Sequence, residues 1–164
     1  NHADIVTPFA LGLADTPGEL PFYVDENRSA CHALLSPSGW HRPNATVPVS
    51  TIDIMVLPME GTVTLIKIDA EGSEPAILDG AANTIMRDRP SVFIEFNIFT
   101  LMTVADVNPR AFLARLKSQF TYVYRFSGTD HYPIKDAAGA VNFLHDIVTR
   151  QGSNTDLFCT FDPL

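Results

Sequence analysis

The fold is decided by the stretch Thr62-Val-Thr-Leu-Ile-Lys-Ile-Asp69, which is followed directly by Ala-Glu-Gly-Ser-Glu74. Its first half is a run of apolar and β-branched residues, which is typical of a buried strand. Its second half is acidic and contains a glycine, after which Ser73, Glu74 and Pro75 suit the first turn of a helix. A strand that leads through a short acidic turn into a helix indicates an α/β sheet.

The same alternation of strands and helices continues along the chain. We predict further strands in residues 91–96, 119–126 and 155–161, and helices that begin at Ser73, at Asn108 and near Val141. Upstream, two strands in residues 4–11 and 19–24 are expected around a Pro-Gly turn. Because strands alternate with helices, we expect one α/β domain over residues 1–164, with a largely parallel sheet and helices on both faces.

The composition narrows the class of protein. The chain has 164 residues, of which 46% are hydrophobic and 18% charged, as in a folded globular domain. A formal net charge of −8 argues against a nucleic-acid partner, since such binding draws on clustered basic side chains. No apolar run reaches the roughly 18 residues that a membrane span needs, so we expect no membrane contact and a cytoplasmic location. The two cysteines, Cys31 and Cys159, are expected to be buried thiols.

Acidic residues lie where two predicted strands end. Asp69 closes the first of these strands and Glu71 follows in the turn, while Glu95 lies near the end of the next strand and precedes Asn97. Ligands of α/β sheets bind outside the carboxyl ends of strands, so these acids are candidates for binding a divalent metal, accepting a substrate proton or bonding to hydroxyls. The alternative for Asp69 and Glu71 is helix capping. Glu95 lies in an apolar string, so a buried carboxyl there must be paired, hydrated or protonated.

Other polar residues are weaker candidates. Residues 25–48 are rich in Asn, Ser, His, Pro and Gly, and we expect them to form a long polar surface segment. His32 and Trp40 in this segment are candidates for substrate binding, together with Asn97. Lys67 interrupts an apolar strand and is expected to pair with Asp69 or Glu95. The five histidines show no metal-ligand spacing, and we assign no metal site.

Four segments resemble the FkbM family of methyltransferases in order and spacing. They are Val47-Pro-Val-Ser-Thr-Ile-Asp53, Leu65-Ile-Lys-Ile-Asp-Ala-Glu-Gly-Ser-Glu74, Ile77-Leu-Asp-Gly-Ala81 and Arg89-Pro-Ser-Val-Phe-Ile-Glu95. The run from Lys67 to Glu74 is the most specific. With an upstream stretch around Ala10-Leu-Gly-Leu-Ala-Asp15, the resemblance covers residues 5–126.

The resemblance implies a class I methyltransferase fold, Rossmann-like, and methyl transfer from S-adenosylmethionine to a hydroxyl of a sugar or other small-molecule or glycan acceptor. It places Asp69 and Glu71 by the reacting methyl group or the acceptor, with Asp69 also contacting the cofactor, and Glu95 in the same cleft. The chain lacks the first two strands of that fold and the glycine-bearing loop, and its nine glycines form no GxGxxG or GxGxG pattern. We therefore expect a gap in the sheet and weak binding of S-adenosylmethionine by the chain alone.

Two other functions remain open. One is a non-catalytic interaction domain that keeps the methyltransferase sheet and forms homo-oligomers through its open edges. The other is a Mg²⁺-dependent hydrolase that uses Asp69, Glu71 and Glu95 as metal ligands.

Overall fold

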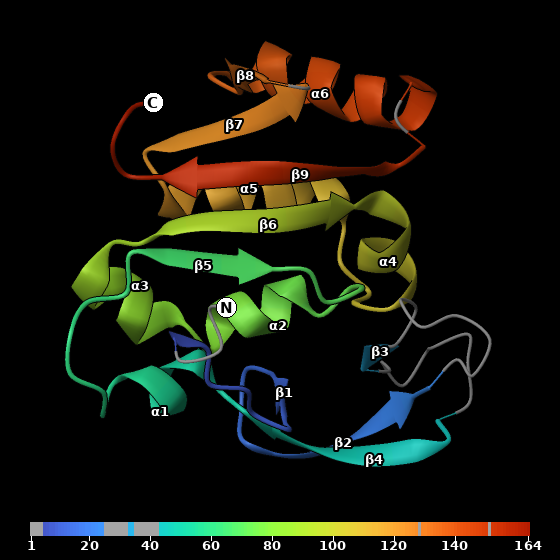
Figure 1. Ribbon diagram of the computed structural model, residues 1–164. Coiled ribbons are helices and arrows are strands. Elements are labelled where there is room, and N and C mark those ends of the chain that lie inside the picture. Colours follow the sequence, from blue (N-terminus) through green and yellow to red (C-terminus); the bar gives the residue numbers. More distant parts are fainter. Residues whose placement is uncertain (1–4, 25–32, 35–42, 128, 151) are drawn as a thin grey trace.

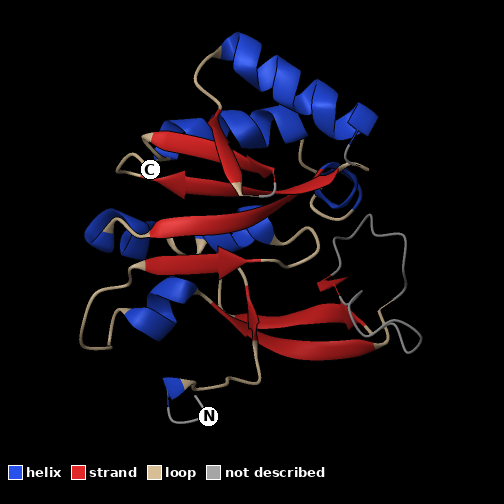
Figure 2. Cartoon of the chain, turned by 45° about the horizontal axis from the view of Figure 1, so that its top comes forward, coloured by secondary structure: helices blue, strands red, loops and turns tan. Residues whose placement is uncertain are grey.

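The computed structural model describes residues 5–24, 33–34, 43–127, 129–150 and 152–164. Strands and helices are mixed in a single α/β arrangement, and the described strands form two separate sheets (Figures 1 and 2). The candidate residues His32 and Trp40 lie outside the described residues. Among the helices of the described ranges, none combines the length and apolar character that a membrane span requires.

The smaller sheet has the strand order β1-β4-β2-β3. Its strands are β1 (Gly12–Leu13), β2 (Gly18–Tyr23), β3 (Ala33–Leu34) and β4 (Ala45–Ser50). β2 runs antiparallel to β3 and β4, whereas β1 runs parallel to β4. This sheet is separate from the one that contains the Asp69 strand.

One expectation about this region is wrong. The first strand is only Gly12–Leu13, and residues Ile5, Val6 and Phe9 of the predicted 4–11 strand are exposed. Residues 25–48, which we expected to form a polar surface segment, include β3 and the start of β4, and their place on the surface stays a prediction. Pro48 is tolerated in β4 because β1 pairs only with Val49 and Ser50, so the missing N–H of Pro48 lies beyond that pairing.

The larger sheet has the order β5-β6-β9-β7-β8. Its strands are β5 (Leu65–Ile68), β6 (Ser91–Asn97), β7 (Tyr122–Ser127), β8 (Asp130–Pro133) and β9 (Asn154–Thr160). Only β5 and β6 pair in parallel, and the β6–β9, β7–β9 and β7–β8 pairs are antiparallel. The expected largely parallel sheet is therefore wrong. The unpredicted strand β8 reverses the chain, so that β9 enters between β6 and β7 from the opposite end.

The helices are α1 (Ile52–Val56), α2 (Glu74–Asp79), α3 (Ala82–Asp88), α4 (Ile98–Thr103), α5 (Pro109–Gln119) and α6 (Ala137–Arg150). The helix expected from Ser73 onward is divided into α2 and α3 at Gly80 and Ala81. A Cβ atom at Gly80 would collide with the carbonyl oxygen of Ala14, so the lack of a side chain at Gly80 lets the segment after β1 approach closely. Met86 in α3 is 76% exposed.

The core lies against one face of the larger sheet. Val92, Ile94 and Phe96 of β6 are completely buried on that face. Phe96 contacts Phe112 of α5 and Phe143 of α6, with ring centroids 6.0 and 5.4 Å apart, so both helices cover the same face. In Figure 1, α5 runs behind the strands. On the opposite face of β5, Leu65 is 58% exposed, which differs from the expected cover of helices on both faces.

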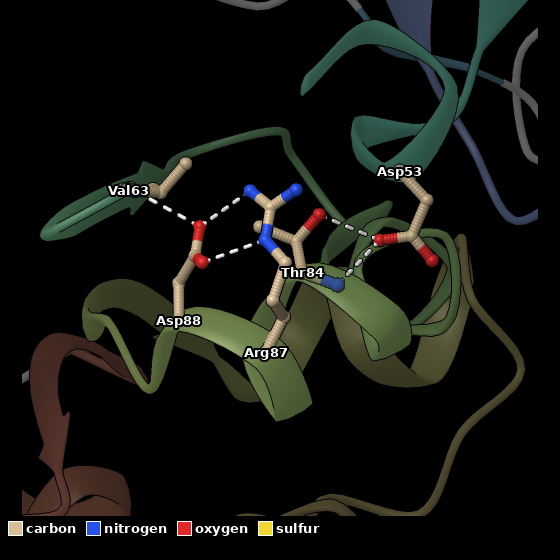
Figure 3. A network of polar contacts seen from close by, with 5 residues as sticks. All are labelled: Asp53, Val63, Thr84, Arg87 and Asp88. Carbon is tan, nitrogen blue, oxygen red and sulfur yellow. Dashed lines mark hydrogen bonds and ion pairs between the residues drawn. The ribbon is translucent and has the colours of Figure 1, made fainter. Parts of the chain in front are cut away.

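Asp53 of α1 caps helix α3. One of its carboxylate oxygens accepts hydrogen bonds from the backbone N–H and the hydroxyl of Thr84, at 2.8 and 2.7 Å. The other accepts from the backbone and side-chain N–H groups of Asn83. Figure 3 shows the Thr84 contacts beside those of Asp88, which pairs with Arg87 and accepts from the backbone N–H of Val63. Asp53 therefore links α1 to α3, and Asp88 links the residues just before β5 to α3.

Replacing Asp53 by Ala should lower the free energy of unfolding by about 1–2 kcal/mol, because the first N–H groups of α3 lose their acceptor. Urea denaturation followed by circular dichroism measures this loss. Asn83→Ala removes a side-chain donor but keeps the backbone contact, and it should cost less. Equal stability of Asp53→Ala and the unmodified chain would show that the cap is unimportant.

Candidate functional site

Three acids meet at the carboxyl ends of β5 and β6. Asp69 follows the last residue of β5, Glu71 lies in the next turn, and Glu95 is near the end of the parallel strand β6. One carboxylate oxygen of each residue lies within 4.8 Å of the other two. β5 and β6 run in the same direction in Figure 1, so their carboxyl ends lie at the same edge of the sheet. Asp69 and Glu95 therefore lie close together, although they are 26 positions apart in the sequence. The structure therefore brings together all three acids predicted from the sequence.

The turn between β5 and α2 is held by Glu74, whose side chain is almost completely buried. The backbone N–H groups of Ala70 and Gly72 donate to Oε1 of Glu74, at 2.9 and 3.2 Å. Burial raises the pKa of Glu74, although these N–H contacts oppose the rise by stabilising the charged form. Glu74 thus has a structural role that its position in the first helical turn did not reveal.

Gly72 lets the turn pack against helix α4. Its φ angle is +102°, and Glu71 beside it has the left-handed φ of +50°. A Cβ atom at Gly72 would lie 2.7 Å from Cβ of Val104 and 2.9 Å from the carbonyl oxygen of Thr100. A side chain there would force the turn away from α4, and the position of Glu71 would change with it.

Glu95 is the most buried acid of the three, at 7% exposure. Its Oε1 accepts a hydrogen bond of 2.8 Å from Nδ2 of Asn154 in β9, while its Oε2 is buried without a hydrogen-bond partner among the described residues. Burial raises the pKa of Glu95 to about 7, and the charge of Glu71 acts in the same direction. Such a carboxyl is half protonated near neutral pH and can accept a proton there.

Asp69 is the exposed member of the site. Nζ of Lys67 donates to its Oδ2 at 2.7 Å, and both side chains are about half exposed. This pair confirms the expected partnership of Lys67 with one of the acids. The contact with Asp69 is the main cause that raises the pKa of Lys67. For Glu71, burial and then the charge of Asp69 raise the pKa.

Asn97 caps helix α4. Its Oδ1 accepts hydrogen bonds from the backbone N–H groups of Phe99 and Thr100, at 3.1 and 3.4 Å. This contact gives Asn97 a structural role, and the expected contact with a substrate stays a prediction. Asn154, which holds Glu95, was not predicted, because pairing between residues 59 positions apart leaves no signal in the local sequence.

A mostly apolar cavity of about 310 Å³ borders the turn at Gly72 and Ser73. It is bordered by Leu13 and Leu20 of the smaller sheet, by Gly72 and Pro75, and by Val104 after α4. Its volume is in the range of small-molecule sites. A larger cavity, of about 530 Å³, lies beside Tyr122, Tyr124 and His131, near the β8 edge of the larger sheet, and none of the three acids borders it.

Acids at the carboxyl ends of neighbouring parallel strands define the class: an α/β protein with a candidate ligand site at the edge where such folds bind ligands. A family model described as the methyltransferase FkbM domain matches residues 2–123, about three-quarters of the chain. The chain therefore belongs to the FkbM methyltransferase family, whose members generally use S-adenosylmethionine. Neither a curated protein nor a solved structure matches the sequence.

Gly72→Ala should destabilise the chain by about 1–3 kcal/mol more than Gly61→Ala, because overpacking adds a cost to backbone strain. The two glycines share a φ of +102°, but nothing lies within 4 Å of a Cβ atom built at Gly61. The comparison isolates the contact with α4 from the strain. Urea denaturation of both variants is the measurement, and equal losses would contradict the close packing described for Gly72.

The free energy of unfolding should fall as the pH rises from about 4.5 to about 7 in metal-free buffer, in part because of Glu95. Its pKa is raised from 4.5 to about 7 in the folded state, so the folded chain binds the proton more tightly than the unfolded chain in this window. The difference in stability between Glu95→Gln and the unmodified chain should therefore shift in favour of the variant between pH 4 and pH 8. Thermal unfolding across this range tests the effect, and Glu60→Gln, which removes an exposed acid, should retain the original slope.

Proposed function

We propose that the protein is an S-adenosylmethionine-dependent O-methyltransferase that acts on a hydroxyl of a sugar or other small-molecule or glycan acceptor. The observation that carries the proposal is the meeting of Asp69, Glu71 and Glu95 at the carboxyl ends of β5 and β6, inside the segment that matches the FkbM domain. Family membership supports methyl transfer, and the acids support an acceptor with an oxygen nucleophile.

The acids fit the charged part of S-adenosylmethionine. Its sulfonium and ammonium groups are cations, and the site has three carboxylates whose only cationic hydrogen-bond partner among the described residues is Lys67. The sequence has no glycine-rich GxGxxG or GxGxG turn that would receive the rest of the molecule. The fit is therefore assigned to the cationic end alone, with Asp69 as its contact.

The residues of the site suit the handling of an acceptor hydroxyl. When bound, S-adenosylmethionine supplies a methyl group activated for transfer to a nucleophile. Asp69 or Glu71 would accept a hydrogen bond from the acceptor hydroxyl and take its proton as the oxygen becomes methylated. Glu95, whose Oε1 is held by Asn154, would lie beside the same acceptor. The Glu74-braced turn holds Glu71 in place, and such positioning supplies much of the rate in group transfer.

Methyl transfer from labelled S-adenosylmethionine to a panel of sugars and glycans, catalysed by the 164-residue chain, tests the proposal. Asp69→Asn should reduce kcat/KM by about 100-fold, the smaller end of the range for acid–base groups. Asp130→Asn, in β8 at the far edge of the sheet, makes the same chemical change and should leave the rate unchanged.

Transfer to no acceptor would overturn the proposed function. An unchanged rate in Asp69→Asn would instead overturn the role of Asp69 and leave methyl transfer standing. Circular dichroism and thermal unfolding of each variant show that a lost rate is not a lost fold.

A further inference from the structure

The acid cluster contains a buried carboxylate oxygen that no donor satisfies. Oxygens of Asp69, Glu71 and Glu95 lie within 4.8 Å of one another, and Oε2 of Glu95 has no hydrogen-bond partner among the described residues. We propose that the cluster binds a hard divalent cation, such as Mg²⁺, Mn²⁺ or Ca²⁺, through one oxygen of each acid.

The burial of Glu95 distinguishes this cluster from an ordinary group of exposed acids on a protein surface. Its side chain is only 7% exposed, so Oε2 has lost water without gaining a protein donor, which is a costly state for a carboxylate. Oε1 is fixed by Asn154, and this contact holds the carboxylate in place. A metal ion bound by Oε2 would supply the missing partner, and the Asn154 contact would orient the ligand.

The local charges favour a cation. Around the three acids, Glu74 lies at the base of the turn and Asp156 is paired with Glu95 across the β6–β9 ladder. The positive charge of Lys67 offsets part of the negative charge of these carboxylates. Its ammonium group bonds to Oδ2 of Asp69, however, and leaves Oδ1 for an ion. Lys67 therefore competes with a metal ion for the site.

The ligand chemistry selects the kind of ion. The cluster contains only carboxylate oxygens, without His or Cys, which suits Mg²⁺, Mn²⁺ or Ca²⁺ rather than softer metals. These ions bind oxygen at about 2.0–2.6 Å, so ligand atoms within 4.8 Å of one another can share one ion after small rotations. Three protein ligands leave further positions on the ion for water or for acceptor oxygens. The binding of an acceptor oxygen rests on the proposed function.

Isothermal titration of the metal-free chain with MnCl₂ and with CaCl₂, without methyl donor or acceptor, tests the proposal. We expect one saturable site per chain. Glu95→Gln should weaken binding by at least about tenfold, as loss of a ligand or of its support does in metal sites. Lys67→Met should tighten binding, because it removes the competing ammonium group. Glu60→Gln removes one negative charge from the loop before β5 and should leave the affinity unchanged.

Absence of saturable binding at millimolar metal would overturn the proposal, as would an unchanged affinity in Glu95→Gln or a failure of Lys67→Met to bind more tightly. Asp69→Asn, at an exposed position, provides a second ligand variant if Glu95→Gln does not fold. A gain of affinity in Lys67→Met cannot come from misfolding. Because no methyl group is transferred in this experiment, its failure and the failure of the proposed function are separate results.

Discussion

The arrangement at the end of β5 depends on one buried carboxylate, that of Glu74. By accepting hydrogen bonds from Ala70 and Gly72, it stabilises a turn that contains two residues with positive φ angles. Burying a carboxylate is unfavourable unless it is bonded, and the two N–H groups offset that cost while they define the path of the backbone. The turn then places Glu71 beside Asp69 and Glu95 and lets Gly72 contact α4.

The sequence predicted local structure better than strand direction. β5, β6, α5 and β9 lie close to their predicted positions, since each has a strong apolar pattern or a clear capping residue. The order and direction of the strands depend on β8, a short exposed strand without an apolar pattern, and this reversal was missed. The short helices α1 and α4 were missed as well, because each spans fewer than two turns and has too few residues for a periodic signal.

The candidate site shows the same division. Asp69, Glu71 and Glu95 could be predicted because acids at the ends of apolar strands are conspicuous, and parallel neighbours bring those ends together. The contacts that support these acids could not be predicted from the sequence. Asn154 reaches Glu95 from an antiparallel strand whose position depends on the topology of the whole sheet. Glu74 looked like an ordinary acid of a first helical turn, and its burial arises only when the turn closes over it.

The central place of β9 in the sheet has a consequence for how the chain folds during its synthesis. β9 follows β5, β6 and β7 in the sequence, yet it lies between β6 and β7 and supplies Asn154 to the acid cluster. During synthesis, β5, β6 and β7 leave the ribosome first and cannot form the finished sheet until residues 154–160 follow. Contacts between such distant segments form slowly. The nascent chain therefore exposes the edges of β6 and β7 until residues 154–160 have been synthesised, and Glu95 gains its contact with Asn154 only then.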